Sequence, residues 1–234
     1  MSITFDFNGR VALVTGAGAG VGLAVARALG AAGAAVICAD INPDRADDAA
    51  DAIVSAGGRA LAQHADVANR FQVSGMIEAG RDAFGRIDIL VNAAGVFKHE
   101  TLFKLDEWDW RRALDVNLTG AFFCTQLVSR VMADEGGGVI VNIASDAAYP
   151  NALAEGIGYA ASKTGLIGMT IQAARELAAS GIRVNAVCPG DVAEDDLPPR
   201  SPQPTPPDMI APLVLFLCSD GARAISGQAI RIAS

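Results

Sequence analysis

Short runs rich in valine and isoleucine alternate with longer alanine-rich stretches along the whole chain. This alternation limits the fold more than any other feature. Apolar strands without a polar side are typical of a parallel sheet that has helices on both faces. Because the crossovers between such strands are right-handed, the sheet closes most naturally by winding outward in both directions from its centre.

The boundaries of the runs give the predicted elements. We expect strands at 10–16, 34–40, 59–66, 87–95, 137–145, 181–190 and 227–234. We expect helices at 21–32, 42–57, about 69–84, 105–133, 159–179 and 207–218. The fold class is therefore α/β, a single doubly wound, Rossmann-type parallel sheet of about seven strands. The chain shows no internal repeat and no sign of a second domain, so residues 1–234 are expected to form one domain.

The composition excludes some classes of partner and indicates the cellular compartment. Of the 234 residues, 51% are apolar and 19% are charged, and the net charge is -8 without any dense basic run. Nucleic acid and anionic membranes are therefore poor partners for this chain. The first residues, "MSITFDFNGR", lack the pattern of a signal peptide, and the apolar runs are too short to span a bilayer. We expect a cytoplasmic protein.

The cysteines and histidines argue against a metal site. The four cysteines lie in apolar stretches without a C-x-x-C pair, at positions 38, 124, 188 and 218. Buried free thiols in a reducing compartment are the better interpretation. His64 and His99 have no metal-ligand spacing to each other or to a cysteine, so we expect no metal.

A glycine-rich turn follows the first predicted strand. The segment "TGAGAGVG", residues 15–22, opens the next helix, where glycines let the backbone approach a diphosphate and the helix N-terminus offers free N–H groups. Asp40 ends the second strand, where a carboxylate can accept hydrogen bonds from both ribose hydroxyls and repel a 2′-phosphate. The pattern favours NAD over NADP. The alternatives are a tight turn without a ligand and an aspartate that only ends a strand.

Tyr159 precedes Lys163 by one helical turn in "GYAASKTG". An ammonium group on the same helix face favours the phenolate over the phenol, which suits a general acid or base. Taken alone, the pair could equally be a half-buried tyrosine and a solvated lysine.

With the upstream motifs, the chain resembles the short-chain dehydrogenase/reductase family from Gly9 to about Ile232. The motifs that carry the resemblance are Thr15, Gly16, Gly20 and Gly22 in the glycine turn, Asp66–Val67, Asn92–Gly95, Asn117 in "LDVNLTG", Ser145 in "NIAS", Tyr159 with Lys163, and Pro189–Gly190. Their order and near-usual spacing make the resemblance specific.

The resemblance implies the site residues. Asn117, Ser145, Tyr159 and Lys163 are the expected catalytic residues, with Asn117 ordering a water beside the lysine. Ser145, at a strand end, would hydrogen-bond the substrate oxygen. The residues expected to bind the cofactor NAD are Thr15, Gly16, Gly20, Val21, Gly22, Asp40, Ile41, Asp66, Val67, Asn92, Ala93, Gly95, Tyr159, Lys163, Pro189, Gly190 and Val192.

The chain departs from the family pattern at several positions. Ser145 precedes Tyr159 by fourteen positions instead of the usual thirteen, Glu194 stands where threonine is common, and the terminal "DGG" is missing. Segment 191–207, which usually carries the substrate lid, is short and holds six of the ten prolines. We expect an open site covered only by a polyproline-like or mobile loop.

Five loop residues are expected to rim the substrate pocket, although ordinary loop surface is the better interpretation for each one individually. They are Phe97, His99, Asp146, Asn151 and Glu155.

The predicted function is an NAD-dependent oxidoreductase that interconverts a secondary alcohol and a ketone. Two alternatives stay open: an NADP-dependent 3-oxoacyl carrier-protein reductase and a non-catalytic nucleotide-binding subunit. Helices that are apolar on more than one side, as in "AFFCTQLVSRVM", together with the resemblance, predict a homo-oligomer, with a tetramer as the expected form. The partner is a small-molecule substrate that the sequence does not name.

Overall fold

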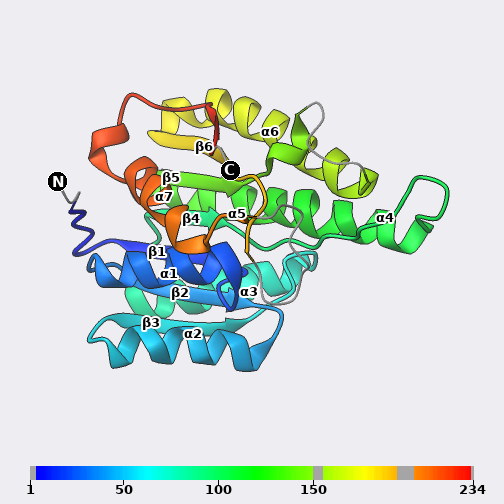
Figure 1. Ribbon diagram of the computed structural model, residues 1–234. Helices are drawn as coiled ribbons and strands as arrows, with labels where there is room; N and C mark the ends of the chain where they lie inside the picture. Colours follow the sequence, from blue (N-terminus) through cyan, green and yellow to red (C-terminus); the bar gives the residue numbers. More distant parts are fainter. Residues whose placement is uncertain (1–3, 150–154, 194–202, 233–234) are drawn as a thin grey trace.

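The structure is a computed structural model that describes residues 4–149, 155–193 and 203–232. One sheet of seven parallel strands runs through it in the order β3-β2-β1-β4-β5-β6-β7 (Figure 1). The strands are β1 Val11–Thr15, β2 Ala35–Asp40, β3 Arg59–His64, β4 Ile89–Asn92, β5 Gly138–Ile143, β6 Ile182–Cys188 and β7 Ala229–Arg231. The predicted doubly wound fold is confirmed.

Helices cover both faces of the sheet (Figure 1). Buried residues of α1, α2 and α7 pack on one face, and those of α3 and α5 pack on the other, where α6 also lies. The helices are α1 Gly20–Ala31, α2 Pro43–Ser55, α3 Arg70–Phe84, α4 Glu107–Leu114, α5 Ala121–Asp134, α6 Ile157–Leu177 and α7 Ala211–Cys218. This covering explains why the central strands are apolar on both sides.

The strand order alone, without any knowledge of side chains, predicts where a ligand would bind. β1 pairs with β2 on one side and with β4 on the other, so the chain reverses its direction of winding between β1 and β4. In open parallel sheets, ligands bind outside the carboxyl ends of the strands at such a reversal. The glycine turn that follows Thr15 lies at this point.

The long helical stretch predicted at 105–133 is present at 107–134, but it is not a regular α-helix throughout. A π-helical turn at Asp115–Gly120 separates α4 from α5. Asn117 lies in this turn, and Gly120 packs so closely on Val67 that an added Cβ would lie 2.7 Å from its Cγ2 atom. Such turns accommodate a local shift of the backbone inside a helix, which an apolar sequence pattern does not register.

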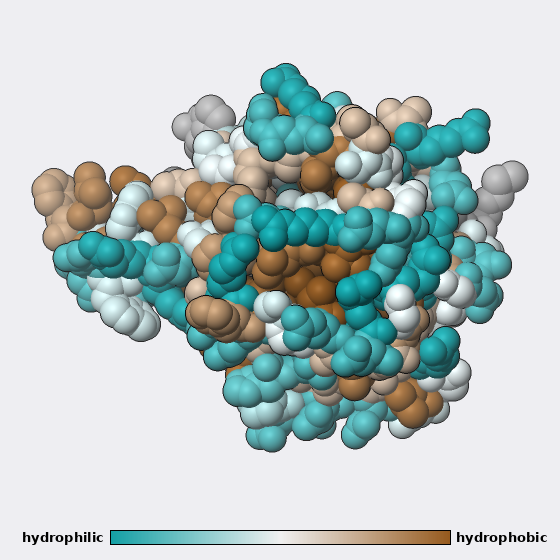
Figure 2. Space-filling view, turned by 180° about the vertical axis from the view of Figure 1, so that it is seen from behind, coloured by the Kyte–Doolittle hydropathy of each residue, from teal (hydrophilic) through white to brown (hydrophobic). Residues whose placement is uncertain are grey.

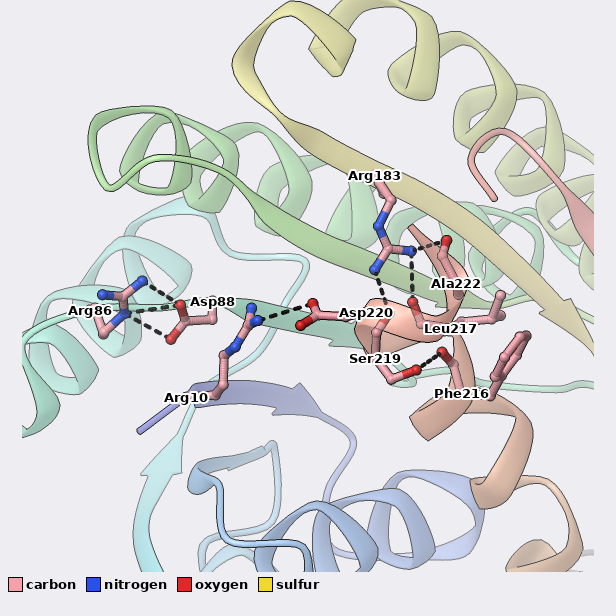
Figure 3. Close-up of polar contacts among 9 residues, drawn as sticks. All are labelled: Arg10, Arg86, Asp88, Arg183, Phe216, Leu217, Ser219, Asp220 and Ala222. Atoms are coloured by element: carbon pink, nitrogen blue, oxygen red, sulfur yellow. Dashed lines mark hydrogen bonds and ion pairs between the residues drawn. The ribbon is translucent and has the colours of Figure 1, made fainter. Parts of the chain in front are cut away.

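Polar contacts at the amino edge of the sheet, opposite the carboxyl edge, hold α7 and the first strands in place (Figure 3). Arg183, at the start of β6, donates to the carbonyl oxygens of Leu217 and Ser219 at 2.8 and 3.1 Å, where α7 ends. The buried carboxylate of Asp88 pairs with Arg86 and also accepts from the first strand. These groups satisfy buried polar atoms far from the carboxyl edge, so we assign them a structural role.

All four cysteines are buried and free, as the sequence predicts. Burial raises the pKa of the Cys38, Cys124 and Cys218 thiols to about 12, so they stay protonated and unreactive at neutral pH. Within the described residues, no helix has the length and apolar character needed to cross a membrane.

Candidate active site

The glycine turn between β1 and α1 leaves no room for a side chain at Gly16 or Gly22. Gly16 has a φ of +65°, and a Cβ there would lie 2.8 Å from the backbone of Ala94. A Cβ on Gly22 would lie 2.0 Å from the carbonyl oxygen of Gly16. No side chain caps the first turn of α1, and Gly20, Val21 and Gly22 of that turn line the cavity, so its N–H groups can bind an anion there.

Thr15 and Asn92 join the carboxyl ends of β1, β4 and β5 beside this turn. The Thr15 hydroxyl accepts hydrogen bonds from the backbone N–H groups of Ala93 and Ala94, both at 3.2 Å. The Asn92 amide donates to Asn142 at 2.8 Å inside the protein. Neither Thr15 nor Asn92 lines the cavity, so contact with a cofactor through their side chains stays a prediction.

Asp40 lies at the carboxyl end of β2 and faces the glycine turn. Its carboxylate accepts from the N–H of Gly18 at 2.9 Å and from the N–H of Asn42 at 3.0 Å. Arg45, in the first turn of α2, packs beside the same glycine, since a Cβ on Gly18 would lie 2.5 Å from the Arg45 Cβ. This end of the cavity therefore presents an anionic and a cationic side chain.

A second carboxylate lies further along this end of the cavity. Asp66 accepts from the N–H of Ala68 at 3.0 Å and pairs with Arg112 at 3.4 Å. Val67 lies next to it in the cavity wall. Sequence reasoning identified Asp66 and Val67 but missed Arg45 and Arg112, because nothing local to either arginine shows that it reaches the cavity.

Tyr159 and Lys163 lie in the first two turns of α6 and line the other end of the cavity, whose total volume is about 550 Å³. The Lys163 ammonium donates to the carbonyl oxygen of Ile143 at 2.7 Å and lies 5.5 Å from the centroid of the Tyr159 ring. Lys163 is buried. A fixed cation thus lies beside the phenol, as the four-residue spacing predicts.

Ser145 follows β5 and lines the cavity near the tyrosine. Its hydroxyl oxygen accepts from the N–H of Ala147 at 3.1 Å, and its proton is directed to the Asp146 carboxylate at a long 3.4 Å. A bond of that length is weak, so a substrate oxygen can compete for the proton.

Asn117 does not line the cavity, but it joins the two segments that do. Its side-chain amide donates to the carbonyl oxygen of Val96 and to the hydroxyl of Ser162, both at 2.9 Å, and its oxygen accepts from the Val96 N–H at 2.8 Å. Ser162 in turn donates to the carbonyl oxygen of Tyr159 at 2.7 Å. The side chain therefore ties the β4–α4 loop to α6. Water ordering by Asn117 stays a prediction.

The second tyrosine of the chain is not positioned for acid–base work. Tyr149 hydrogen-bonds Cys188, and the Arg231 guanidinium lies 4.6 Å from its ring centroid. Burial raises the pKa of the Tyr149 phenol, so it stays protonated at neutral pH. Tyr149 is also absent from the cavity lining.

Pro189, Gly190 and Val192 line the cavity after β6. Val192 forms a parallel bridge with Thr205, and the Thr205 N–H donates to the carbonyl oxygen of Asp191 at 2.8 Å. The two ends of segment 191–207 are thus joined. Residues 194–202, with Glu194, and the loop residue Asn151 lie outside the described residues, so the open lid stays a prediction.

The remaining predicted cofactor residues meet in the same cavity. Those that line it are Gly16, Gly20, Val21, Gly22, Asp40, Ile41, Asp66, Val67, Ala93, Gly95, Tyr159, Lys163, Pro189, Gly190 and Val192.

Comparison with known proteins agrees with this arrangement. Residues 10–203 match the family model described as short chain dehydrogenase. The chain belongs to this family.

Several relatives in the short-chain dehydrogenase family cover almost the whole chain. A 3-oxoacyl-[acyl-carrier-protein] reductase from Synechocystis sp. is 39% identical over 95% of both chains. A D-threitol dehydrogenase from Mycolicibacterium smegmatis is 37% identical over 97% of this chain and 93% of its own. A solved 7α-hydroxysteroid dehydrogenase in complex with NADH and 7-oxoglycochenodeoxycholic acid is 34% identical, with a TM-score of 0.91 over 97% of this chain and 94% of that one.

The chain is thus an oxidoreductase of this family, and its cavity fits a nicotinamide dinucleotide. The glycine cradle has no space for a Cβ, the helix N-terminus is open for a diphosphate, and a carboxylate stands at the end of β2. The differing names of the relatives show that the family alone does not determine the substrate.

Proposed function

We propose that the protein is an NAD(H)-dependent oxidoreductase that interconverts a secondary alcohol and a ketone, with residues 1–234 forming one dinucleotide-binding and catalytic domain. One observation carries the proposal. Tyr159, Lys163 and Ser145 line the same cavity as Asp40 and the glycine cradle, so a dinucleotide held at one end can reach them at the other. Its four buried free thiols suit the cytoplasm.

Each of these residues has a separate role in the proposed reaction. The bound nicotinamide supplies or accepts the hydride. Tyr159 gives its proton to the substrate oxygen in reduction and takes it back in oxidation. The Lys163 ammonium stabilises the phenolate, and the Ser145 hydroxyl donates to the substrate oxygen as charge develops there.

A 3-oxoacyl carrier-protein reductase that uses NADP is the second candidate, and the Synechocystis relative favours it. Asp40 disfavours the additional phosphate, and a chain with a net charge of -8 is poorly matched to an acidic carrier protein. A non-catalytic nucleotide-binding subunit is the third. Turnover of NADH and NADPH with a panel of ketones and with an acyl carrier substrate separates all three.

We expect NADH to bind at least about tenfold more tightly than NADPH, because like charges about 4 Å apart near a protein surface repel by a few kcal/mol. The Asp40→Ser variant should gain NADPH affinity, since Arg45 then faces the phosphate without a competing carboxylate. The double variant Asp40→Ser with Arg45→Ala is the control and should lose that gain. Fluorescence titration with both cofactors measures the affinities. Tighter binding of NADPH by the unmodified protein would contradict the assignment.

We also expect a homotetramer of 24.0 kDa chains. Figure 2 shows a hydrophobic hollow framed by hydrophilic residues on the face that carries α3, α5 and α6. A groove of about 330 Å³ lies between α5 and α6, with Phe122, Met169 and Leu177 in its walls, and Phe122 is 42% exposed. Apolar surface of this kind marks an interaction site.

Sedimentation tests the assembly. The Phe122→Glu variant should dissociate, because it places a charge in the groove. Phe71→Glu is the matched control, since Phe71 is 88% exposed on α3 and does not line the groove. A monomer at micromolar concentration would show that the unmodified chain does not assemble.

A further inference from the structure

The loop between β4 and α4 is fastened to the residues that precede the catalytic helix. The N–H of Gly156 donates to the carbonyl oxygen of Glu100 at 3.1 Å. The His99 Nδ1 atom lies 2.9 Å from the Glu155 Oε2 atom. No side chain caps the N-terminus of α6, so these two contacts fix the backbone just before the turn that holds Tyr159.

Phe97 fills the space between this loop and the catalytic tyrosine. Its ring packs edge-on against the Tyr159 ring, with centroids 4.8 Å apart at 73°, and packs edge-on against His99 at 5.8 Å. Phe97 is half-buried and lines the cavity. Phe97 therefore forms part of the pocket wall, and the interpretation of Phe97 as ordinary loop surface is wrong.

Gly156 packs closely against the Phe97 ring and restricts its position. Its φ is +101°, and a Cβ there would lie 2.8 Å from the Phe97 ring. Only glycine meets both demands, because other residues adopt this backbone conformation rarely and would push the ring away. The ring position thus depends on backbone on both sides.

Other apolar residues and one carboxylate line the same cavity as Phe97. Val96, Ile143 and Val192 line it with Phe97, whereas Asp191 places a carboxylate in the wall after Gly190. An apolar substituent gains by contact with the ring, whereas a carboxylate on the substrate would approach a like charge.

On the basis of the proposed function, we propose that Phe97 is the specificity-determining residue of the substrate site. It selects uncharged secondary alcohols and ketones that carry an aromatic or bulky apolar group on the reacting carbon. His99 and Glu155 are positioning residues that hold the ring against Tyr159.

Matched methyl ketones test the wall. With NADH, the unmodified protein should show a higher kcat/KM for acetophenone than for 2-butanone, which differ only in the apolar group. Phe97→Ala should lower that ratio by about tenfold or more, since a lost apolar contact in a pocket is worth roughly 10–200-fold. Phe97→Leu should restore part of it, and the NADH Kd should change less than twofold.

Binding without turnover gives a second readout. In the presence of NADH, with which an alcohol cannot react, 1-phenylethanol should raise the Tm of the unmodified protein more than 2-butanol does, and Phe97→Ala should abolish the difference. An unchanged kcat/KM ratio and an unchanged Tm difference in Phe97→Ala would overturn the assignment of the wall while the oxidoreductase function stands. No turnover of any ketone by the unmodified protein would instead overturn the proposed function.

The positioning pair is tested in the same loop. His99→Ala and Glu155→Gln should each raise the KM for acetophenone about threefold to fivefold with kcat within twofold, as an exposed ion pair allows. His99→Lys should restore part of the KM because it places an ammonium group opposite Glu155. Lys98→Ala is the matched control, since it breaks the Lys98–Asp109 pair of the same loop and should leave the KM unchanged. Equal effects of His99→Ala and Lys98→Ala would show that the pair only stabilises the loop.

Discussion

We expect the Tyr159→Phe variant to lose about 10²–10⁴-fold in turnover, the usual contribution of a positioned general acid or base. The substitution removes only the hydroxyl group. The ring that packs on Phe97 and the contact of Lys163 with Ile143 do not depend on it. NADH affinity should therefore stay within a few-fold of the unmodified protein, so the loss falls on kcat.

The chain provides a matched control, since it has only one other tyrosine. Tyr149→Phe removes a hydroxyl that hydrogen-bonds Cys188 and does not line the cavity, so turnover should stay within a few-fold. Steady-state kinetics and NADH titration on both variants decide the matter. A loss of less than tenfold in Tyr159→Phe would mean that another group transfers the proton.

The Gly22→Ala variant should lose at least about tenfold in NADH affinity, or about 1.4 kcal/mol. The added Cβ would lie 2.0 Å from the carbonyl oxygen of Gly16, and because that oxygen belongs to the backbone, the whole turn must move. Overpacking of this kind costs roughly 1–3 kcal/mol, which lowers the Tm of a domain of this size by about 2–10 °C.

Gly75→Ala separates this clash from the general effect of losing a glycine. Gly75 lies in α3, and an added Cβ would meet no atom within 4 Å. Its NADH affinity should not change, and its Tm should stay equal or rise, because alanine favours a helix by roughly 0.5–1 kcal/mol over glycine. Calorimetry and NADH titration test both variants. Normal cofactor affinity in Gly22→Ala would show that the cradle is not at this turn.

Local patterns account for what could be predicted of the fold. A strand that is buried on both faces must be apolar throughout, and a helix must bury one stripe, so the sequence marks each element where it occurs. The turn at residues 15–22 is equally local, since Gly22 is required by its own backbone contact with Gly16. The spacing of Tyr159 and Lys163 determines by itself that they share a helix face.

Tertiary structure alone decided which separate segments meet. Arg45 lies with Asp40 beside Gly18, and Arg112 pairs with Asp66. Strand register and helix packing bring these residues together, and sequence spacing predicts neither arrangement. Asn117, in the π-helical turn, likewise contacts Val96 of a separate loop. Loops have no period to reveal their course.

The contrast is sharpest around the reacting atoms. The sequence determined that a tyrosine and a lysine lie together at the start of a helix, because helical geometry relates residues four positions apart. Only the folded chain brings Phe97 against Tyr159, since sixty-two positions separate them in the sequence. The pairing of the tyrosine with the lysine can thus be predicted from local spacing. The shape of the pocket cannot, because it arises from long-range packing that no local pattern encodes.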